Sequence, residues 1–270
     1  MQKSQFEQLH RWFYDYVRTC YVPGDEYLNS NLHLKECHTR RVCAEMRALA
    51  AALAMNGDEA VLAETIALLH DIGRFAQFKK YRTYKDVNSE NHCLLGLRII
   101  DEYGLINELP ADEQTIIRQA VEFHGAKELP AMDERTARFA QMIRDADKLD
   151  IYCLCAENYR LFHENKAAFV LEVEFPDRPD ISPSILDAVM NNRLIDYRHV
   201  KTLTDAKLMQ LGWVFDVYFD WTLRQIRDRG CLDAIAHWLP DIAPAQRAWR
   251  HIQKCVAERL DHPPITEPRK

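Results

Sequence analysis

The chain has 270 residues, a formal net charge of −6 at pH 7, 47% hydrophobic residues and 28% charged residues. This composition is that of a globular protein with a sizeable core. The negative charge and the scattered Lys and Arg argue against a long nucleic-acid partner, but they are compatible with a small phosphorylated ligand. Only eight glycines accompany many Ala, Leu, Glu, Arg and Gln residues, which favours a mostly helical fold.

The eight cysteines form no CxxC pair and follow no regular spacing. We therefore expect free thiols, mostly buried, in a reducing compartment. No apolar run approaches the roughly 20 residues that cross a bilayer, and the first residues do not resemble a signal peptide. These features predict a cytoplasmic protein with no membrane segment.

Apolar residues recur at helical spacing over residues 3–20 and predict a first helix, followed by a turn at 22–27. A second helix is expected over 32–55, closed by Asn56-Gly57. Asp58 then has the character of an N-cap. The helix that it opens ends at His70-Asp71.

Residues 75–90 are polar and aromatic without a clear period, which predicts a long surface loop. An irregular stretch is expected at 175–183, where Pro and Asp are frequent. The remaining segments predict helices over 90–103, 112–124, from 133 onward, 183–191, 204–229 and 244–261.

We divide the chain into three parts: an N-terminal helix and loop over 1–29, a core unit over 30–165, and a helical extension over 166–270. The extension is expected to pack on the core. The fold class expected from this pattern is all-α.

Metal-capable side chains recur on the apolar sides of the expected helices. Adjacent His and Asp residues at the end of a buried helix need a partner, because such groups are costly to bury alone. A lone His on an apolar face is more often a hydrogen-bonded core residue than a ligand. Repetition of the pattern on five helices favours a metal site instead, with the candidate ligands His38, His70, Asp71, His92, His124 and Asp147.

These six side chains suffice for one or two divalent cations, with one carboxylate between two of them. Nitrogen and oxygen ligands together suit Mn, Fe, Co, Ni, Zn or Mg. The absence of Cys from the set argues against a closed structural zinc site.

Three ordered pieces of sequence carry a resemblance to a known family: His38 with Arg41-Val42, LLHDIGRF at 68–75, and DADKLD at 145–150. Together they resemble the HD-domain superfamily of metal-dependent phosphohydrolases over about residues 30–155. The resemblance implies an all-α HD-domain helical bundle with a metal site at its centre and a C-terminal helical extension.

The resemblance also implies roles for the candidate ligands. His38, His70, Asp71 and Asp147 match the ligands of the first metal, with Asp71 as the bridge. Asp147 is preferred to Asp145 because the family's pattern is A-D-x-L. His92 and His124 match the two extra histidines of the dinuclear branches.

Two departures from the family's patterns exclude particular substrates. The cyclic-di-nucleotide branch has a His-His pair where this chain has His124-Gly125, and its GYP signature is missing. The (p)ppGpp hydrolases have an acidic pair shortly after the HD motif, where this chain has Ile72 to Phe75. Neither substrate class is expected.

The expected function is hydrolysis of a phosphate ester or anhydride of a small phosphorylated metabolite, a nucleotide above all, by metal-activated water. Asp71, Arg74 and Lys148 are the expected catalytic residues. The expected substrate-binding residues are Arg74, Tyr81, Arg82, Lys201 and Asp205. Two alternatives stay open: an HD-type di-iron oxygenase, and a non-catalytic nucleotide-binding sensor.

Overall fold

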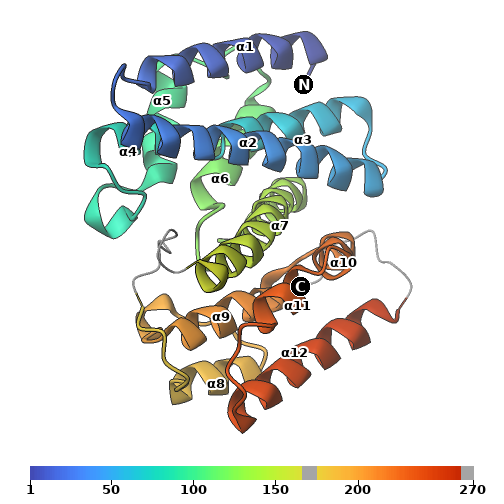
Figure 1. Ribbon diagram of the computed structural model, residues 1–270. Helices are drawn as coiled ribbons and strands as arrows, with labels where there is room; N and C mark the ends of the chain where they lie inside the picture. Colours follow the sequence, from blue (N-terminus) through green and yellow to red (C-terminus); the bar gives the residue numbers. More distant parts are fainter. Residues whose placement is uncertain (166–174, 263–270) are drawn as a thin grey trace. The chain divides into compact units, whose positions relative to one another are not determined.

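The computed structural model describes residues 1–165 and 175–262, and its regular elements there are all helical (Figure 1). The predicted all-α fold is confirmed. The chain separates into two compact units, Met1–Asp147 and Lys148–Lys270. This boundary falls inside helix α7 (Glu134–Glu164), whereas the sequence placed the end of the core at residue 165. The three-part division and the packing of the extension on the core therefore stay predictions.

The first unit consists of the N-terminal part of α7 and the helices before it. Helix α2 packs along α3, and α4 packs along α5 (Figure 1). Phe13 of α1 and Phe75 of α4 meet edge to face in the core, with ring centroids 5.7 Å apart. The helices are α1 (Lys3–Cys20), α2 (Glu26–Ala52), α3 (Gly57–Leu69), α4 (Ile72–Tyr81), α5 (His92–Glu102) and α6 (Ala111–Phe123), with a short 3₁₀ turn η1 (Asp86–Asn88) before α5.

Side-chain caps set the starts of three of these helices. The carboxylate of Asp25 accepts from the backbone N–H of Leu28 at 2.9 Å, so α2 begins at Glu26, six residues before the predicted start. Asn56, not Asp58, caps α3. Asn91 caps α5. In each case a short polar side chain satisfies one of the free N–H groups of the first turn.

The prediction of a surface loop over 75–90 is wrong for its first part, because α4 extends to Tyr81. Helix α4 buries Phe75, Phe78 and the polar residue Gln77. The amide nitrogen of Gln77 donates to Asp86, to Ser89 and to the carbonyl of Glu90. Gln77 thus occupies a buried position where a regular helical pattern would have an apolar residue. The prediction of a loop followed from the absence of that pattern.

Gly73 lies in the first turn of α4. A Cβ atom at this position would lie 2.1 Å from the carbonyl oxygen of His92 and 2.7 Å from the backbone nitrogen of Gly96. Both are backbone atoms of α5, which cannot rotate away. The missing side chain therefore permits the close contact between α4 and α5.

The second unit contains the C-terminal part of α7 and a bundle of shorter helices. Its core includes Tyr152, Tyr159 and Phe219, each at most 1% exposed. Helix α9 packs against α8, α11 and α12. The helices are α8 (Pro183–Met190), α9 (Leu203–Gly212), α10 (Asp220–Asp228), α11 (Cys231–Ala236) and α12 (Ala243–Leu260), with 3₁₀ turns η2 (Tyr197–His199) and η3 (Trp213–Asp216).

The single long helix predicted over 204–229 is wrong, because the chain turns between α9 and α10. Arg259 of α12 holds this break: its guanidinium donates to the carbonyls of Val217 and Tyr218 and to the carboxylate of Asp220. In a continuous helix these carbonyl groups would accept hydrogen bonds from backbone N–H groups further along the same helix. Here they accept from the guanidinium of a distant helix instead. That contact is not visible in the local sequence.

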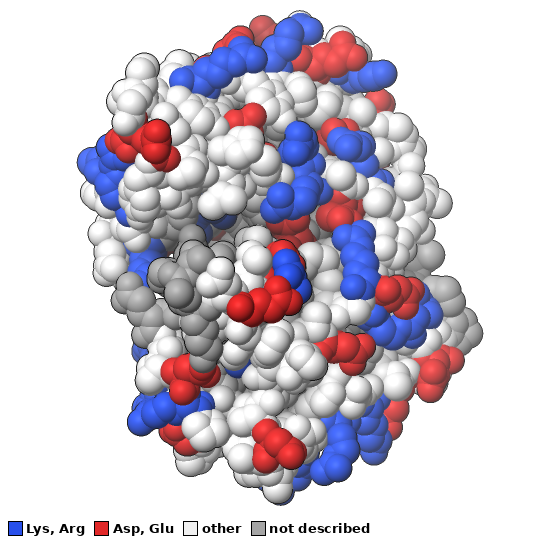
Figure 2. Space-filling model, viewed as in Figure 1, with Lys and Arg blue, Asp and Glu red and all other residues white. Residues whose placement is uncertain are grey.

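Charged residues of both signs are interspersed over the face of the molecule that Figure 2 shows. None of the described helices has the length and apolar character that a lipid bilayer requires of a spanning segment. All eight cysteines are free thiols; four of them are buried and four are partly exposed, whereas most were expected to be buried.

Replacement of Gly73 by Ala tests the contact between α4 and α5. We expect Gly73→Ala to lower the free energy of unfolding by about 3 kcal/mol, since the new methyl group overlaps backbone atoms. Gly57→Ala is the matched control, because a Cβ atom there would have nothing within 4 Å. It should change stability by less than about 1 kcal/mol. Denaturant unfolding measures both; equal effects would contradict the close contact.

Candidate metal centre

The six candidate ligands all lie in the first unit, at the ends and inner faces of its helices. His70 and Asp71 form the junction of α3 and α4, and five of the six residues are buried. Asp147 is partly exposed, with 19% of its side chain accessible. The others are His38 on α2, His92 at the first position of α5 and His124 at the end of α6.

The carboxylate of Asp71 lies between two pairs of histidines. Its Oδ2 atom is 3.6 Å from Nε2 of His38 and 3.7 Å from Nε2 of His70. Its Oδ1 atom is 3.6 Å from Nε2 of both His92 and His124. Each oxygen thus faces one pair of imidazoles, which is the arrangement that a carboxylate bridging two cations requires.

Hydrogen bonds at the outer nitrogen orient three of these imidazoles. In each, Nδ1 contacts an atom that only accepts, so Nδ1 carries a proton and Nε2 is the nitrogen that faces Asp71. Nε2 is therefore the nitrogen that a metal would bind. The contacts are His70 with the Ala67 carbonyl at 2.7 Å, His124 with the Val121 carbonyl at 2.8 Å, and His92 with Asp86 Oδ2 at 2.7 Å.

His70 provides a direct test of whether a cation fits this site. Its side chain is 0% exposed, and its Nε2 atom has no hydrogen-bond partner among the described residues. A buried nitrogen in this state loses the hydrogen bond that water would supply. A divalent cation would satisfy it, so the donor set fits a metal.

Asp147 completes the side of the site that contains His38. Its Oδ1 atom lies 3.2 Å from Nε2 of His38. Its carboxylate, with His70 and His124, forms a group whose ligand atoms all lie within 4.8 Å of one another. Helix α7 thus presents to the centre the aspartate that the sequence analysis preferred to Asp145.

His92 and His124 require a positive charge between them. Their Nε2 atoms are 3.2 Å apart, and both rings carry a proton on Nδ1. Two facing lone pairs at this distance repel unless a proton or a cation lies between them. Burial alone would lower the pKa of His124, but its hydrogen bonds to Asp71 and Cys93 outweigh burial and raise that pKa to about 10.

The other ionisable groups of the centre respond to burial and to one another. Burial lowers the pKa of His70 to about 4, so this imidazole is neutral at pH 7. Burial opposes ionisation of Asp71, but Lys35 and His70 hold the pKa of this carboxyl well below its ordinary value. Burial likewise opposes ionisation of Asp147, and its hydrogen bond with His38 lowers that pKa.

The sequence analysis missed three residues at this centre. Lys35 places its ammonium 2.9 Å from Oδ2 of Asp71; its position one helical turn before His38 was an available signal. Asp86 orients His92 from a segment predicted to be a loop. Cys93 lies with its sulfur 3.4 Å from Nε2 of His92. Burial opposes ionisation of this thiol, but its hydrogen bonds to His124 and His92 lower its pKa to about 6.

Arg74, predicted as a catalytic and substrate-binding residue, lies beside the centre. Its Nε atom is 3.4 Å from Oδ1 of Asp71. Its Nη1 atom donates to Gln77, to the Tyr84 carbonyl and to Asp86. The guanidinium is therefore held in place at the edge of the ligand set.

The remaining predicted residues have contacts away from this ligand set. Lys148 forms an ion pair with Asp216 at 2.6 Å within the second unit. Arg82 pairs with Asp25, and the ring of Tyr81 lies under the ammonium of Lys80. Their assigned roles in catalysis and substrate binding stay predictions.

Asp205 and Lys201 share a local contact in the second unit. The buried carboxylate of Asp205 accepts from the backbone N–H of Lys201, and from the backbone N–H and hydroxyl of Ser182. These bonds tie the chain before α8 to the start of α9. They give Asp205 a structural role, and substrate binding by this pair stays a prediction.

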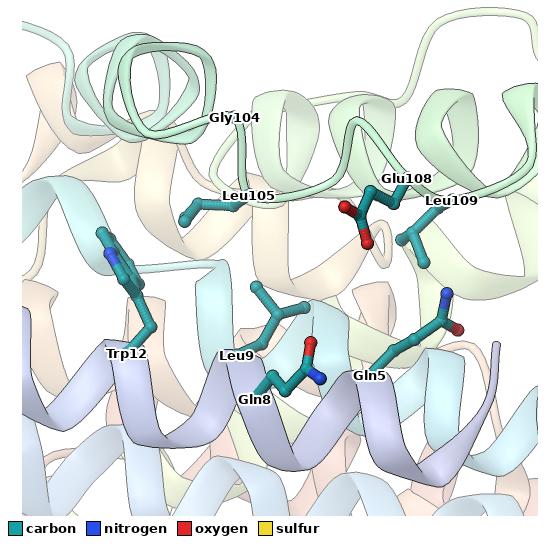
Figure 3. Close-up of a pocket in the computed structure, with 8 residues that line it drawn as sticks. All are labelled: Gln5, Gln8, Leu9, Trp12, Gly104, Leu105, Glu108 and Leu109. Atoms are coloured by element: carbon teal, nitrogen blue, oxygen red, sulfur yellow. The ribbon is translucent and has the colours of Figure 1, made fainter.

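A pocket of about 240 Å³ lies elsewhere in the first unit, between α1 and the connection from α5 to α6 (Figure 3). Trp12, Leu9 and two glutamines of α1 line one side. Leu105, Glu108 and Leu109 line the other. The lining includes none of the six candidate ligands, so this pocket is separate from the metal centre.

Comparison with known families places this centre in context. The family model of the HD domain matches residues 36–152, a range that includes all six candidate ligands. This part of the chain is therefore similar to HD domains. HD domains form a superfamily whose members are generally metal-dependent hydrolases. No curated protein and no solved structure shows significant similarity to the chain.

Metal binding beside His124 should release protons. The raised pKa of His124, about 10, means that this imidazole is protonated at pH 7 in the metal-free protein. An ion that takes its Nε2 lone pair must displace that proton, so affinity should rise about tenfold per pH unit up to about pH 10. His70, with a pKa of about 4, should release none.

Titration calorimetry in buffers of different ionisation enthalpy counts the released protons. The wild type should release about one or more at pH 7, and His124→Gln should release fewer. Proton release that is the same in the two proteins would contradict the assignment.

Loss of the Asp86 carboxylate should weaken metal binding without removing a ligand. Asp86→Asn exchanges the carboxylate that orients His92 for a neutral amide, and we expect metal affinity to fall by about 10- to 100-fold. Asp101→Asn, on the same unit and paired with Arg118 at the surface, is the control. Competition with a chromophoric chelator measures both affinities. Unchanged affinity in Asp86→Asn would show that His92 needs no partner.

Proposed function

We propose that this protein is a metal-dependent phosphohydrolase that cleaves a phosphate ester or anhydride of a small phosphorylated metabolite, above all a nucleotide. The observation that carries the proposal is the Asp71 carboxylate, with each oxygen 3.6–3.7 Å from a pair of histidine Nε2 atoms. Divalent cations held there supply Lewis-acid activation of water and of a phosphoryl oxygen.

The cations of the chain itself support this chemistry. Lys35 and Arg74 approach opposite oxygens of Asp71, at 2.9 Å and 3.4 Å. Negative charge develops on the phosphoryl oxygens during hydrolysis, and positioned cations stabilise it. Arg74 can also contact two phosphate oxygens at once through its planar guanidinium. These two residues are the proposed phosphate-binding groups.

An aromatic ring beside these cations supports a nucleotide as the substrate. The ring of Tyr84 has the Lys35 ammonium 5.4 Å from its centroid and the Arg74 guanidinium carbon 6.0 Å away. Its hydroxyl donates to the carbonyl of Asn31, which fixes its orientation. A ring that stacks on a base next to groups that bind phosphate is a combination suited to a nucleotide.

Phosphate release from a substrate panel tests the proposal. The full chain, loaded in turn with Mn²⁺, Fe²⁺, Co²⁺, Ni²⁺, Zn²⁺ and Mg²⁺, would be assayed with nucleoside mono-, di- and triphosphates and sugar phosphates. We expect phosphate or pyrophosphate release that a chelator abolishes and that Asp71→Asn lacks. No turnover with any metal would overturn the proposal. Oxygen consumption by the iron-loaded protein would favour the oxygenase alternative instead.

Removal of the Lys35 charge should impair catalysis while sparing metal binding. We expect Lys35→Met to lower kcat/KM by about 100-fold, the effect of losing one positioned donor to developing charge. Metal content should be unchanged, because Lys35 is not a ligand. Lys3→Met, at an exposed position of α1, is the control and should keep full activity. Equal kcat/KM in the two variants would exclude Lys35 from the site.

A further inference from the structure

Cys93 is the second residue of α5 and directly follows His92. Its side chain is buried, at 3% exposed, and its sulfur lies among nitrogen atoms. The sulfur is 3.4 Å from Nε2 of His92 and 3.6 Å from Nδ1 of His124. One ligand atom from each of these three residues lies within 4.8 Å of the other two. This is the environment of a ligand, since a structural buried thiol packs mainly on carbon.

We propose that Cys93 is a metal ligand. Its thiolate would complete, with His92, His124 and Oδ1 of Asp71, a site for one zinc-like cation. The inference rests on the metal centre proposed above and extends it, because the six nitrogen and oxygen ligands leave Cys93 unused. The thiolate donates an electron pair to the cation, any proton still on the sulfur passes to solvent, and no oxidation state changes.

Four of the six distances among the proposed donor atoms agree with tetrahedral coordination. The two Nε2 atoms are 3.2 Å apart, and each lies 3.6 Å from Oδ1 of Asp71. The sulfur is 3.4 Å from Nε2 of His92. Bonds of about 2.0–2.1 Å to nitrogen and about 2.3 Å to sulfur space the donors of a tetrahedral zinc ion about 3.3–3.6 Å apart. Little movement is needed to accept an ion.

The surrounding backbone keeps the sulfur in this position. A Cβ atom at Gly125 would lie 3.7 Å from the sulfur of Cys93 and 3.5 Å from Cε1 of His92, so this turn closes over both side chains. The side chain of Asn91 accepts from the backbone N–H of Leu94 and fixes the first turn of α5. The thiol is therefore held against the imidazoles from two sides.

A thiolate on one side only would make the two halves of the centre chemically different. The half with His38, His70 and Asp147 offers nitrogen and oxygen, which suit harder ions such as Mn²⁺ or Mg²⁺. The half with Cys93 offers sulfur as well, which favours Zn²⁺ or other borderline ions. We therefore infer that the Cys93 half discriminates strongly between zinc and manganese.

Cobalt absorption spectroscopy tests the sulfur–metal bond without using activity. The metal-free full chain would be titrated with Co²⁺, and bound cobalt would be counted by elemental analysis. We expect a near-ultraviolet sulfur-to-cobalt charge-transfer band in the wild type, and its loss in both Cys93→Ser and Cys93→Ala. Cys43→Ser is the matched control, since Cys43 is also buried but lies on α2, and it should keep the band.

Zn²⁺ affinity supplies a second readout. Cys93→Ser should bind Zn²⁺ about 100-fold more weakly, which is the upper end of the loss that follows removal of a residue that merely contacts a ligand. The affinity for Mn²⁺ should change little. Bound cobalt with no charge-transfer band in the wild type would overturn the role of Cys93 and leave the phosphohydrolase proposal intact. A band retained in Cys93→Ala would also overturn it. Failure to bind any cobalt would overturn both.

Discussion

The buried carboxylate of Asp71 determines how the first unit is arranged. A carboxylate that is only 5% exposed is stable as an ion only if positive charge or hydrogen-bond donors surround it. In this protein Lys35, Arg74 and the protonated His124 provide that charge, from α2, α4 and the end of α6. Three helices are therefore held around one side chain. The fold itself assembles the candidate metal centre, and a cation bound there would replace charges that are already in place.

The sequence predicted most helices because their apolar period is regular, as in α1 and α6. It failed where tertiary contacts replace that period. Helix α4 buries Gln77 in a network of polar contacts, so its pattern resembles that of a loop. The break between α9 and α10 depends on Arg259, a residue more than 30 positions further along the chain. Such contacts cannot be inferred from local composition.

The candidate metal ligands were easier to select from the sequence than the residues that contact them. A ligand set has a fixed chemistry, so residues such as His38 and Asp147 can be found by residue type, helical face and order along the chain. Lys35, Asp86 and Cys93 take part only because the fold brings them to the centre. Lys148 shows the converse, since its neighbour Asp147 faces the site while its own ammonium binds Asp216. Adjacency in sequence does not decide which charge reaches a site.

Asp86 contacts both a proposed phosphate-binding residue, Arg74, and a candidate metal ligand, His92. One of its oxygens accepts from Nη1 of Arg74 at 2.9 Å, and the other accepts from Nδ1 of His92 at 2.7 Å. A substrate phosphate that draws Arg74 toward itself would leave this carboxylate to His92 alone, and a stronger negative partner makes an imidazole a more basic ligand. Phosphate and metal would then raise each other's affinity by the same factor, as thermodynamic reciprocity requires. One shared side chain would thus let the protein hold a metal most tightly when substrate is bound.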